Sequence, residues 1–196
     1  MAVTRERYEQ GMTYDQYLAQ FTRDRATFEA NARDANIDPA AIDAFRKAGP
    51  LHVLVITEDW CGDALANVPL LARLAREAGN VDLRFFLRDQ NDDLTSQYMN
   101  GEFKSIPVFV FFDKDFREIG HWIERPKSVT DRRAKERREI YASDPAFGSP
   151  DQPADRLTDD VRSRLQAALA AMRARMKPWA DGEVVRELCA LVTQGA

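Results

Sequence analysis

Four short runs of β-branched and aromatic residues mark the middle of the chain. Their length and composition are typical of strands, and their nearly continuous apolar character indicates burial on both faces. The runs are LHVLVI (51–56), VDLRFFL (81–87), IPVFVFF (106–112) and FREIGHW (116–122). Between the first two, apolar side chains recur at helical spacing from Leu65 to Ala75, and Gly79 follows. This pattern predicts an amphipathic helix that ends at a glycine.

The order of these elements predicts a mixed sheet. A short helix over residues 93–99 precedes the third run, so helical connections separate the first three strands and permit parallel pairing by right-handed crossover. Only Asp113-Lys114-Asp115 joins the last two strands, which are therefore expected to pair as an antiparallel hairpin. Helices should cover both faces of the sheet. We expect an α/β fold with three α/β/α layers.

Both ends of the chain have helical patterns. Thr13 and Gln16 form a capping box, and Asp38-Pro39 is a second helix start. After a charged segment, residues 142–155 are rich in proline and are expected to be a loop or linker. Two apolar stripes follow, at 161–176 and in a last helix at 184–192. We predict an N-terminal helical extension (1–50), a core (51–125) and a C-terminal helical extension (126–196), all packed as one globular unit.

Composition narrows the class of protein. A chain of 196 residues supports one substantial core, and its net charge of -4 gives no reason to expect nucleic acid or an anionic membrane as partner. No apolar segment approaches the ~20 residues of a membrane-spanning helix, and the N-terminus lacks an apolar leader. We therefore expect a cytoplasmic protein. Two cysteines and two histidines, widely spaced, predict neither a disulfide framework nor a metal site.

Cys61 is the candidate for chemistry. It stands between a strand and a helix, where free backbone N–H groups and the helix dipole favour a thiolate. Glu58, Asp59 and Asp63 oppose that charge, so we expect a pKa that is modestly lowered at most. Asp63 has a simpler alternative role, which is to accept hydrogen bonds from amides of the first helical turn.

At this point the sequence resembles the thioredoxin-like family. Trp60-Cys61-Gly62 after a buried strand is similar to the family's Trp-Cys-Gly-Pro-Cys site. Pro69 matches its helix proline, Ser105-Ile106-Pro107 its cis-proline loop, and Ile119-Gly120 the pair that borders its substrate groove. The resemblance covers roughly residues 50–123. It is closest to a bacterial group with a Trp-Cys-Gly-Asp motif, whose members carry Cys or Ala at the fifth position.

The resemblance implies a site and also shows two departures from it. Cys61 would be the catalytic nucleophile, facing a groove to which six residues contribute: Trp60, Gly62, Asp63, Ile106, Pro107 and Gly120. The second cysteine of the family is replaced by Ala64, and its buried acid by Val55. Both parts of the resolving step are therefore missing, and a two-cysteine cycle is not expected.

Three functions stay open on the sequence. The first is a monothiol redox protein in which Cys61 forms mixed disulfides with a protein or with glutathione, without any other cofactor. The second is a redox-inactive binding or scaffold module that uses the same groove. The third, iron–sulfur or glutathione binding of the monothiol glutaredoxin type, matches only at Cys-Gly. His121 is a candidate accessory base or an ordinary strand histidine, and Cys189 is expected to be a structural cysteine.

Overall fold

The computed structural model describes residues 3–152 and 156–194. The chain divides into two compact units. The first runs as far as Arg125 and takes up the chain again from Val184, and the second is Pro126–Glu183. The boundary expected after residue 125 coincides with the start of the second unit. From the sequence we expected a single globular unit with one C-terminal extension. The structure has two compact units, and the C-terminal extension is divided between them.

A four-stranded mixed sheet forms the centre of the first unit. Its strands are β1 (Leu51–Thr57), β2 (Val81–Leu87), β3 (Val108–Phe112) and β4 (Glu118–Ile123), in the order β2-β1-β3-β4. The pair β1–β2 is parallel and β3–β4 antiparallel, as expected. The second helical connection differs from the expectation, because β3 runs antiparallel to β1. That connection contains only two short helices, η1 (Arg88–Gln90) and α6 (Asp92–Thr95), and it returns the chain in the opposite direction.

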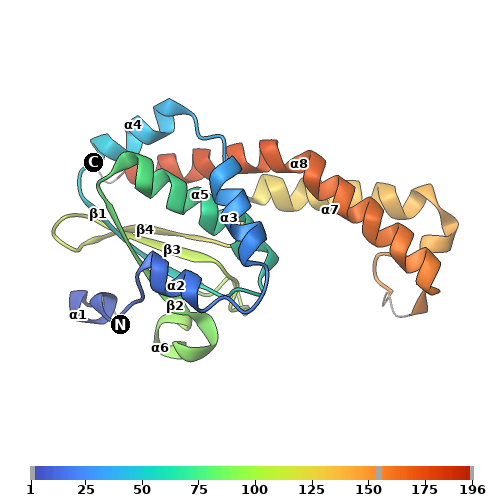
Figure 1. Ribbon diagram of the computed structural model, residues 1–196, viewed down its shortest axis with the longest axis horizontal. Coiled ribbons are helices and arrows are strands. Elements are labelled where there is room, and N and C mark those ends of the chain that lie inside the picture. Colours follow the sequence, from blue (N-terminus) through green and yellow to red (C-terminus); the bar gives the residue numbers. More distant parts are fainter. Residues whose placement is uncertain (1–2, 153–155, 195–196) are drawn as a thin grey trace. The chain divides into compact units, whose positions relative to one another are not determined.

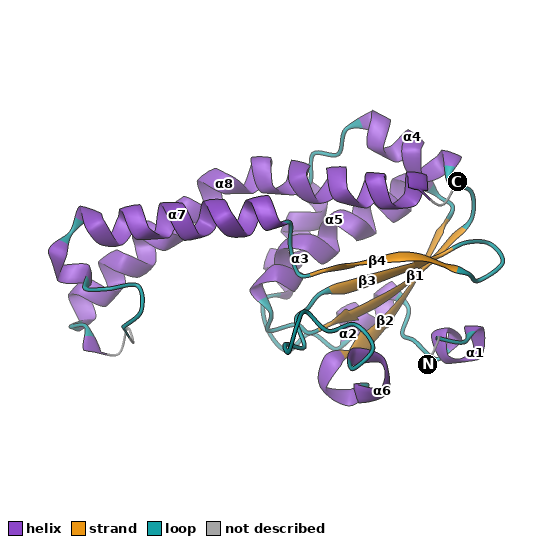
Figure 2. Ribbon diagram, turned by 180° about the vertical axis from the view of Figure 1, so that it is seen from behind, coloured by secondary structure: helices purple, strands orange, loops and turns teal. Residues whose placement is uncertain are grey.

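Helices cover both faces of this sheet (Figures 1 and 2). The N-terminal segment forms α1 (Arg5–Glu9), α2 (Tyr14–Ala19), α3 (Arg25–Asp34) and α4 (Pro39–Lys47), and α5 (Gly62–Ala78) follows β1. The capping box of Thr13 and Gln16 is present at the start of α2. The Asp38 side chain accepts from the amide of Ala40 at the start of α4. The local sequence therefore sets these helix starts.

Alternation along the strands produces two hydrophobic clusters, one on each face. Val53 and Val55 of β1 belong to the cluster with α3, α4, α5 and the last turns of α8, whereas Leu54 and Ile56 belong to the other, with Tyr8 and Leu94. Such alternation places successive side chains on opposite faces of a sheet. The result is the three-layer α/β/α arrangement expected from the sequence.

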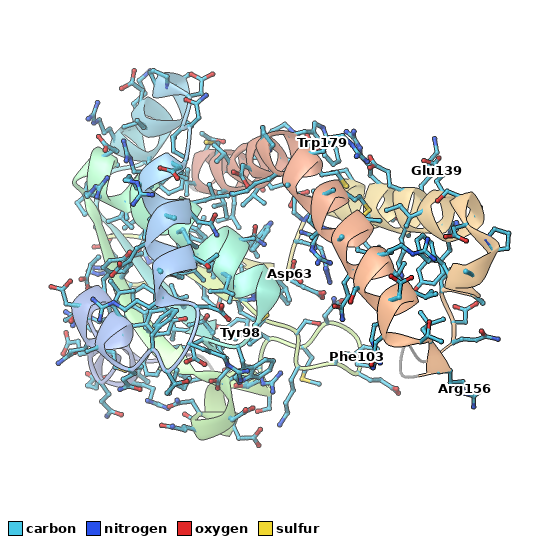
Figure 3. The ribbon with its side chains drawn as sticks, turned by 45° about the vertical axis from the view of Figure 1, so that its right-hand side comes forward. Asp63, Tyr98, Phe103, Glu139, Arg156 and Trp179 are labelled. Atoms are coloured by element: carbon cyan, nitrogen blue, oxygen red, sulfur yellow. The ribbon has the colours of Figure 1, made fainter. Side chains whose placement is uncertain are left out.

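The second unit consists of α7 (Lys127–Ser143), η2 (Pro145–Phe147) and most of α8 (Asp159–Gln194). The two stripes that predicted separate helices lie on this one helix, which continues through Pro178. Between α7 and α8, the Arg132 guanidinium lies 4.5 Å from the Trp179 ring centroid. Figure 3 labels Trp179 on α8. Residues 153–155 of the expected linker lie outside the described residues. Within the described ranges, no helix has the length and apolar character to cross a membrane.

Candidate functional site

Cys61 lies between the end of β1 and the start of α5. It is the N-cap residue of α5, in extended conformation, and its side chain packs against both hydrophobic clusters. The thiol donates a hydrogen bond to the carbonyl of Ile106, with an Sγ–O distance of 3.5 Å. The Ile106–Pro107 peptide bond is cis. Residues 61, 106 and 107, far apart in the sequence, therefore form one site.

Burial raises the pKa of the Cys61 thiol, and this corrects the expectation of a slightly lowered pKa. Hydrogen bonds from the backbone amides of Ala64 and Asp63 favour the thiolate, but they do not offset the loss of solvent. The negative charges of Asp63 and Glu124 raise the pKa of the Cys61 thiol further. The helix start is thus built to stabilise an anion, while its surroundings hold the thiol protonated.

Two residues after β4 belong to the site and carried no signal in the sequence. The Arg125 guanidinium lies 2.9 Å from the Asp63 carboxylate, and the two side chains are 24% and 15% exposed. Arg125 also pairs with Glu124, while its Nε is buried and has no hydrogen-bond partner among the described residues. Asp63 therefore makes an ion pair across 62 residues of sequence. A capping role was the simpler expectation.

From the sequence we expected Gly120 to border the groove beside Pro107. In the structure, Glu124 lies beside Pro107 instead. Its amide donates to the Pro107 carbonyl at 2.8 Å, and its φ of 66° lies in the left-handed region. Gly120 pairs instead with Phe111, further along the sheet, and a Cβ built on it would lie 3.6 Å from Leu191 of α8. The structure thus places Gly120 under the C-terminal helix and a glutamate next to the proline.

The surroundings of Cys61 differ in how open they are. Trp60 is 41% exposed, and the Arg88 guanidinium lies 4.7 Å from its ring centroid. Gly62 is exposed, and a Cβ built on it would meet no atom within 4 Å beyond its chain neighbours and the backbone of its own helix. Ile106 and Pro107 are buried and present little side-chain area. An aromatic residue, Phe103, is exposed on the loop before them (Figure 3).

The remaining candidates lie elsewhere or are apolar. Ala64 and Val55, which replace the second cysteine and the acid of the resemblance, are buried in the same hydrophobic cluster. Cys189 lies on α8, and its sulfur is 3.9 Å from the carbonyl oxygen of Ala41. His121 lies 3.3 Å from the Glu118 carboxylate and packs edge-on against the ring of Tyr98, so its accessory role stays a prediction. The described ranges hold no cluster of three or more His, Cys, Asp or Glu residues suited to a metal ion.

Comparison with known proteins identifies the family. A family model described as thioredoxin matches residues 11–137, more than half of the chain. The chain therefore belongs to the thioredoxin family. A search of curated proteins finds no match.

Two solved structures cover the whole of this chain and are themselves covered completely. One is the 1.5 Å crystal structure of a protein of unknown function from Pseudomonas aeruginosa, with 18% identity and a TM-score of 0.68. The other is an HIV epitope scaffold, with 16% identity and a TM-score of 0.65. At these identities the likeness establishes the fold, including the helical extensions.

Proposed function

We propose that the protein is a monothiol thiol–disulfide exchange protein of the Trp-Cys-Gly-Asp type. The observation that carries this proposal is the position of the Cys61 sulfur, at the amino end of α5 and 3.5 Å from the Ile106 carbonyl. A nucleophilic sulfur at a helix start receives amide hydrogen bonds in its anionic form, and Asp63 and Ala64 supply them. Trp60 and Gly62 flank Cys61 in the chain, and Pro107 follows Ile106 through the cis peptide bond.

The exchange balances without a second cysteine. The Cys61 thiolate attacks one sulfur of a disulfide R–S–S–R′, a new bond forms between Cys61 and R–S, and R′–S⁻ leaves. An outside thiolate, such as that of glutathione, then attacks the R–S sulfur, forms a disulfide with it and returns the Cys61 thiolate. The partner is covalently bound to Cys61 between these two steps, and the protein ends as the thiolate with which it began, without a net change in its oxidation state.

The raised pKa of Cys61 gives this cycle a particular character. A protonated thiol attacks slowly, but a thiolate of high pKa is the stronger nucleophile once formed and the poorer leaving group. The mixed disulfide should therefore form slowly and persist. Loss of the thiol proton on oxidation also frees the Ile106 carbonyl, which can then accept an N–H from the bound partner.

The redox-inactive binding module is the second candidate, and the same pKa favours it. A thiol held protonated by burial, with exposed aromatic side chains at Trp60 and Phe103, also suits a surface that binds a partner without chemistry. The two candidates differ in whether binding requires the sulfur of Cys61.

Trapping of mixed disulfides separates the two candidates. Cells producing the wild type, Cys61→Ser or Cys189→Ser are quenched in acid, alkylated and analysed on non-reducing gels. The matched control is Cys189→Ser, because Cys189 is also a half-buried thiol whose pKa is raised by burial. We expect adducts in the wild type and in Cys189→Ser that are absent from Cys61→Ser. Adducts that survive in Cys61→Ser, or the absence of adducts from all three, would exclude the exchange function.

A reductase assay tests the one-cysteine cycle. Reduction of insulin by dithiothreitol should be weak or undetectable with this protein, because Ala64 cannot release the mixed disulfide. Turnover at the rate of a dithiol protein would mean that Cys189 serves as the resolving thiol.

A further inference from the structure

The outer edge of the first unit contains a cavity that is remote from Cys61. It has a volume of about 310 Å³ and lies between the start of α2, the end of α3, the second half of α5 and strand β2. Its lining residues on α5, Ala72 to Arg76, follow Cys61 by about three helical turns. The site is therefore distinct from the thiol.

Small and apolar side chains create the space. Ala32 of α3 and Ala72 and Ala75 of α5 face the cavity, with Val81 and Leu83 of β2 on its other side. With about 30 Å³ for each water-sized group, the cavity holds roughly ten non-hydrogen atoms. That volume is at the lower end of the range for small-molecule sites.

Two polar groups at the cavity are not fully used by the protein. The Arg76 side chain is 66% exposed, and its nearest anion, Glu77, lies 3.6 Å away and is already 2.9 Å from Arg73. The Tyr14 hydroxyl has no hydrogen-bond partner among the described residues, and burial raises its pKa, so it stays a proton donor. The positive charge of Arg76 partly offsets this rise in the pKa of Tyr14, whereas the carboxylates of Glu29 and Asp15 add to it.

The one carboxylate at the cavity wall is occupied by other partners. The Asp82 side chain accepts from the hydroxyl of Tyr8 at 2.9 Å and from the guanidinium of Arg84 at 3.3 Å. It therefore does not neutralise Arg76. The cavity combines an apolar interior with a guanidinium and a hydroxyl donor at its rim.

We infer that this cavity binds a medium-chain carboxylate, with the alkyl chain between α5 and β2 and the carboxylate at Arg76 and Tyr14. A guanidinium forms charge-assisted hydrogen bonds to a carboxylate, and a neutral ligand cannot form them. A straight chain of eight carbons has ten non-hydrogen atoms with its carboxylate, so octanoate matches the volume.

The test is a titration of the full chain with octanoate, followed by calorimetry and by amide chemical shifts. We expect saturable binding with shifts confined to the residues that line the cavity. Arg76→Gln should weaken binding by about two- to fivefold, the effect of removing one solvent-exposed ion pair. Glu77→Gln should strengthen it, because Glu77 competes for both guanidinium groups. Arg33→Gln is the matched control, since Arg33 pairs with Asp34 on the surface of α3.

Two further measurements keep the inference falsifiable. Octanol should bind more weakly than octanoate, and Arg76→Gln should not change its affinity. Ala72→Leu should fill the cavity and abolish binding; if it unfolds, the exposed Arg76→Gln variant decides. Absence of saturable binding, equal affinity in the wild type and Arg76→Gln, or shifts that cluster around Trp60 instead would overturn the inference. Because none of these readouts uses the thiol, failure here leaves the proposed exchange function untouched.

Discussion

The ion pair between Asp63 and Arg125 should control both the stability of the first unit and the reactivity of Cys61. The two charges lie 2.9 Å apart and are mostly buried. Breaking a fully buried pair by removing one partner costs about 3–5 kcal/mol, and an exposed pair contributes about 1 kcal/mol or less. Side chains that are 15% and 24% exposed lie between these limits, so Arg125→Gln should lose about 2 kcal/mol.

Urea denaturation measures this loss. Trp179 belongs to the second unit, so a Trp179→Phe background leaves Trp60 and Trp122 as fluorescence reporters of the first. For a chain of this size, a loss of about 2 kcal/mol corresponds to a melting temperature lower by roughly 4–8 °C. The double variant Asp63→Asn/Arg125→Gln should be more stable than the sum of the single losses predicts.

The same two variants should change the reactivity of Cys61 in opposite directions. Asp63→Asn removes a charge that raises the pKa of the thiol, so alkylation by iodoacetamide at neutral pH should become faster. Arg125→Gln leaves the Asp63 carboxylate uncompensated, so alkylation should become slower. Both rates are measured in a Cys189→Ser background. Rates that move in the same direction, or single losses that simply add, would refute the assignment of this pair to the site.

Three other outcomes can be measured on the same samples. Because the pKa of Cys61 is raised, the folded state favours the neutral thiol. This contribution to stability is complete below about pH 8.5 and is lost as the pH rises through the pKa of the folded state. The free energy of unfolding should therefore fall relative to that of Cys61→Ala only in alkaline buffer. Gly11→Ala should lower the free energy of unfolding, measured by urea denaturation, by about 1–3 kcal/mol, because the added Cβ would lie 2.6 Å from the Phe86 ring. An unchanged urea midpoint would mean that the ring moves freely. Asn67→Ala should lower the free energy of unfolding by about 1–2 kcal/mol and change the rate of Cys61 alkylation, because the buried Asn67 side-chain amide donates to the Glu124 carbonyl at 2.8 Å. A loss of stability without a change in the alkylation rate would mean that Asn67 does not act on the site.

Local patterns in the sequence predicted the elements of the fold well. The capping box at Thr13 and the Asp38-Pro39 start determine helix ends through contacts within three residues, and such contacts are visible in a linear sequence. Alternation along the strands likewise predicted burial on two faces. The antiparallel placement of β3 beside β1 depends on the path of residues 88–107, which no periodicity describes.

The site was predicted only as far as its motif extends. Cys61 and Pro107 lie together, as the resemblance implied, but Glu124 and Arg125 reach them from the end of β4 without any motif. The direction of the pKa shift at Cys61 was missed for the same reason. Charges near a residue in sequence can be counted, whereas burial by two hydrophobic clusters depends on the assembled fold.

Helix α8 makes the two units inseparable by a single cut in the chain. Its last turns supply Val184, Leu188 and Val192 to the cluster behind β1, although the helix starts in the other unit. A shortened chain ending at Arg125 would keep every strand and every residue around the thiol, yet leave that cluster uncovered. Truncation would thus yield a fragment that exposes apolar side chains and aggregates. A circular permutant that joins residues 184–194 to the first unit would keep these side chains covered, so that the thiol could be studied without the second unit.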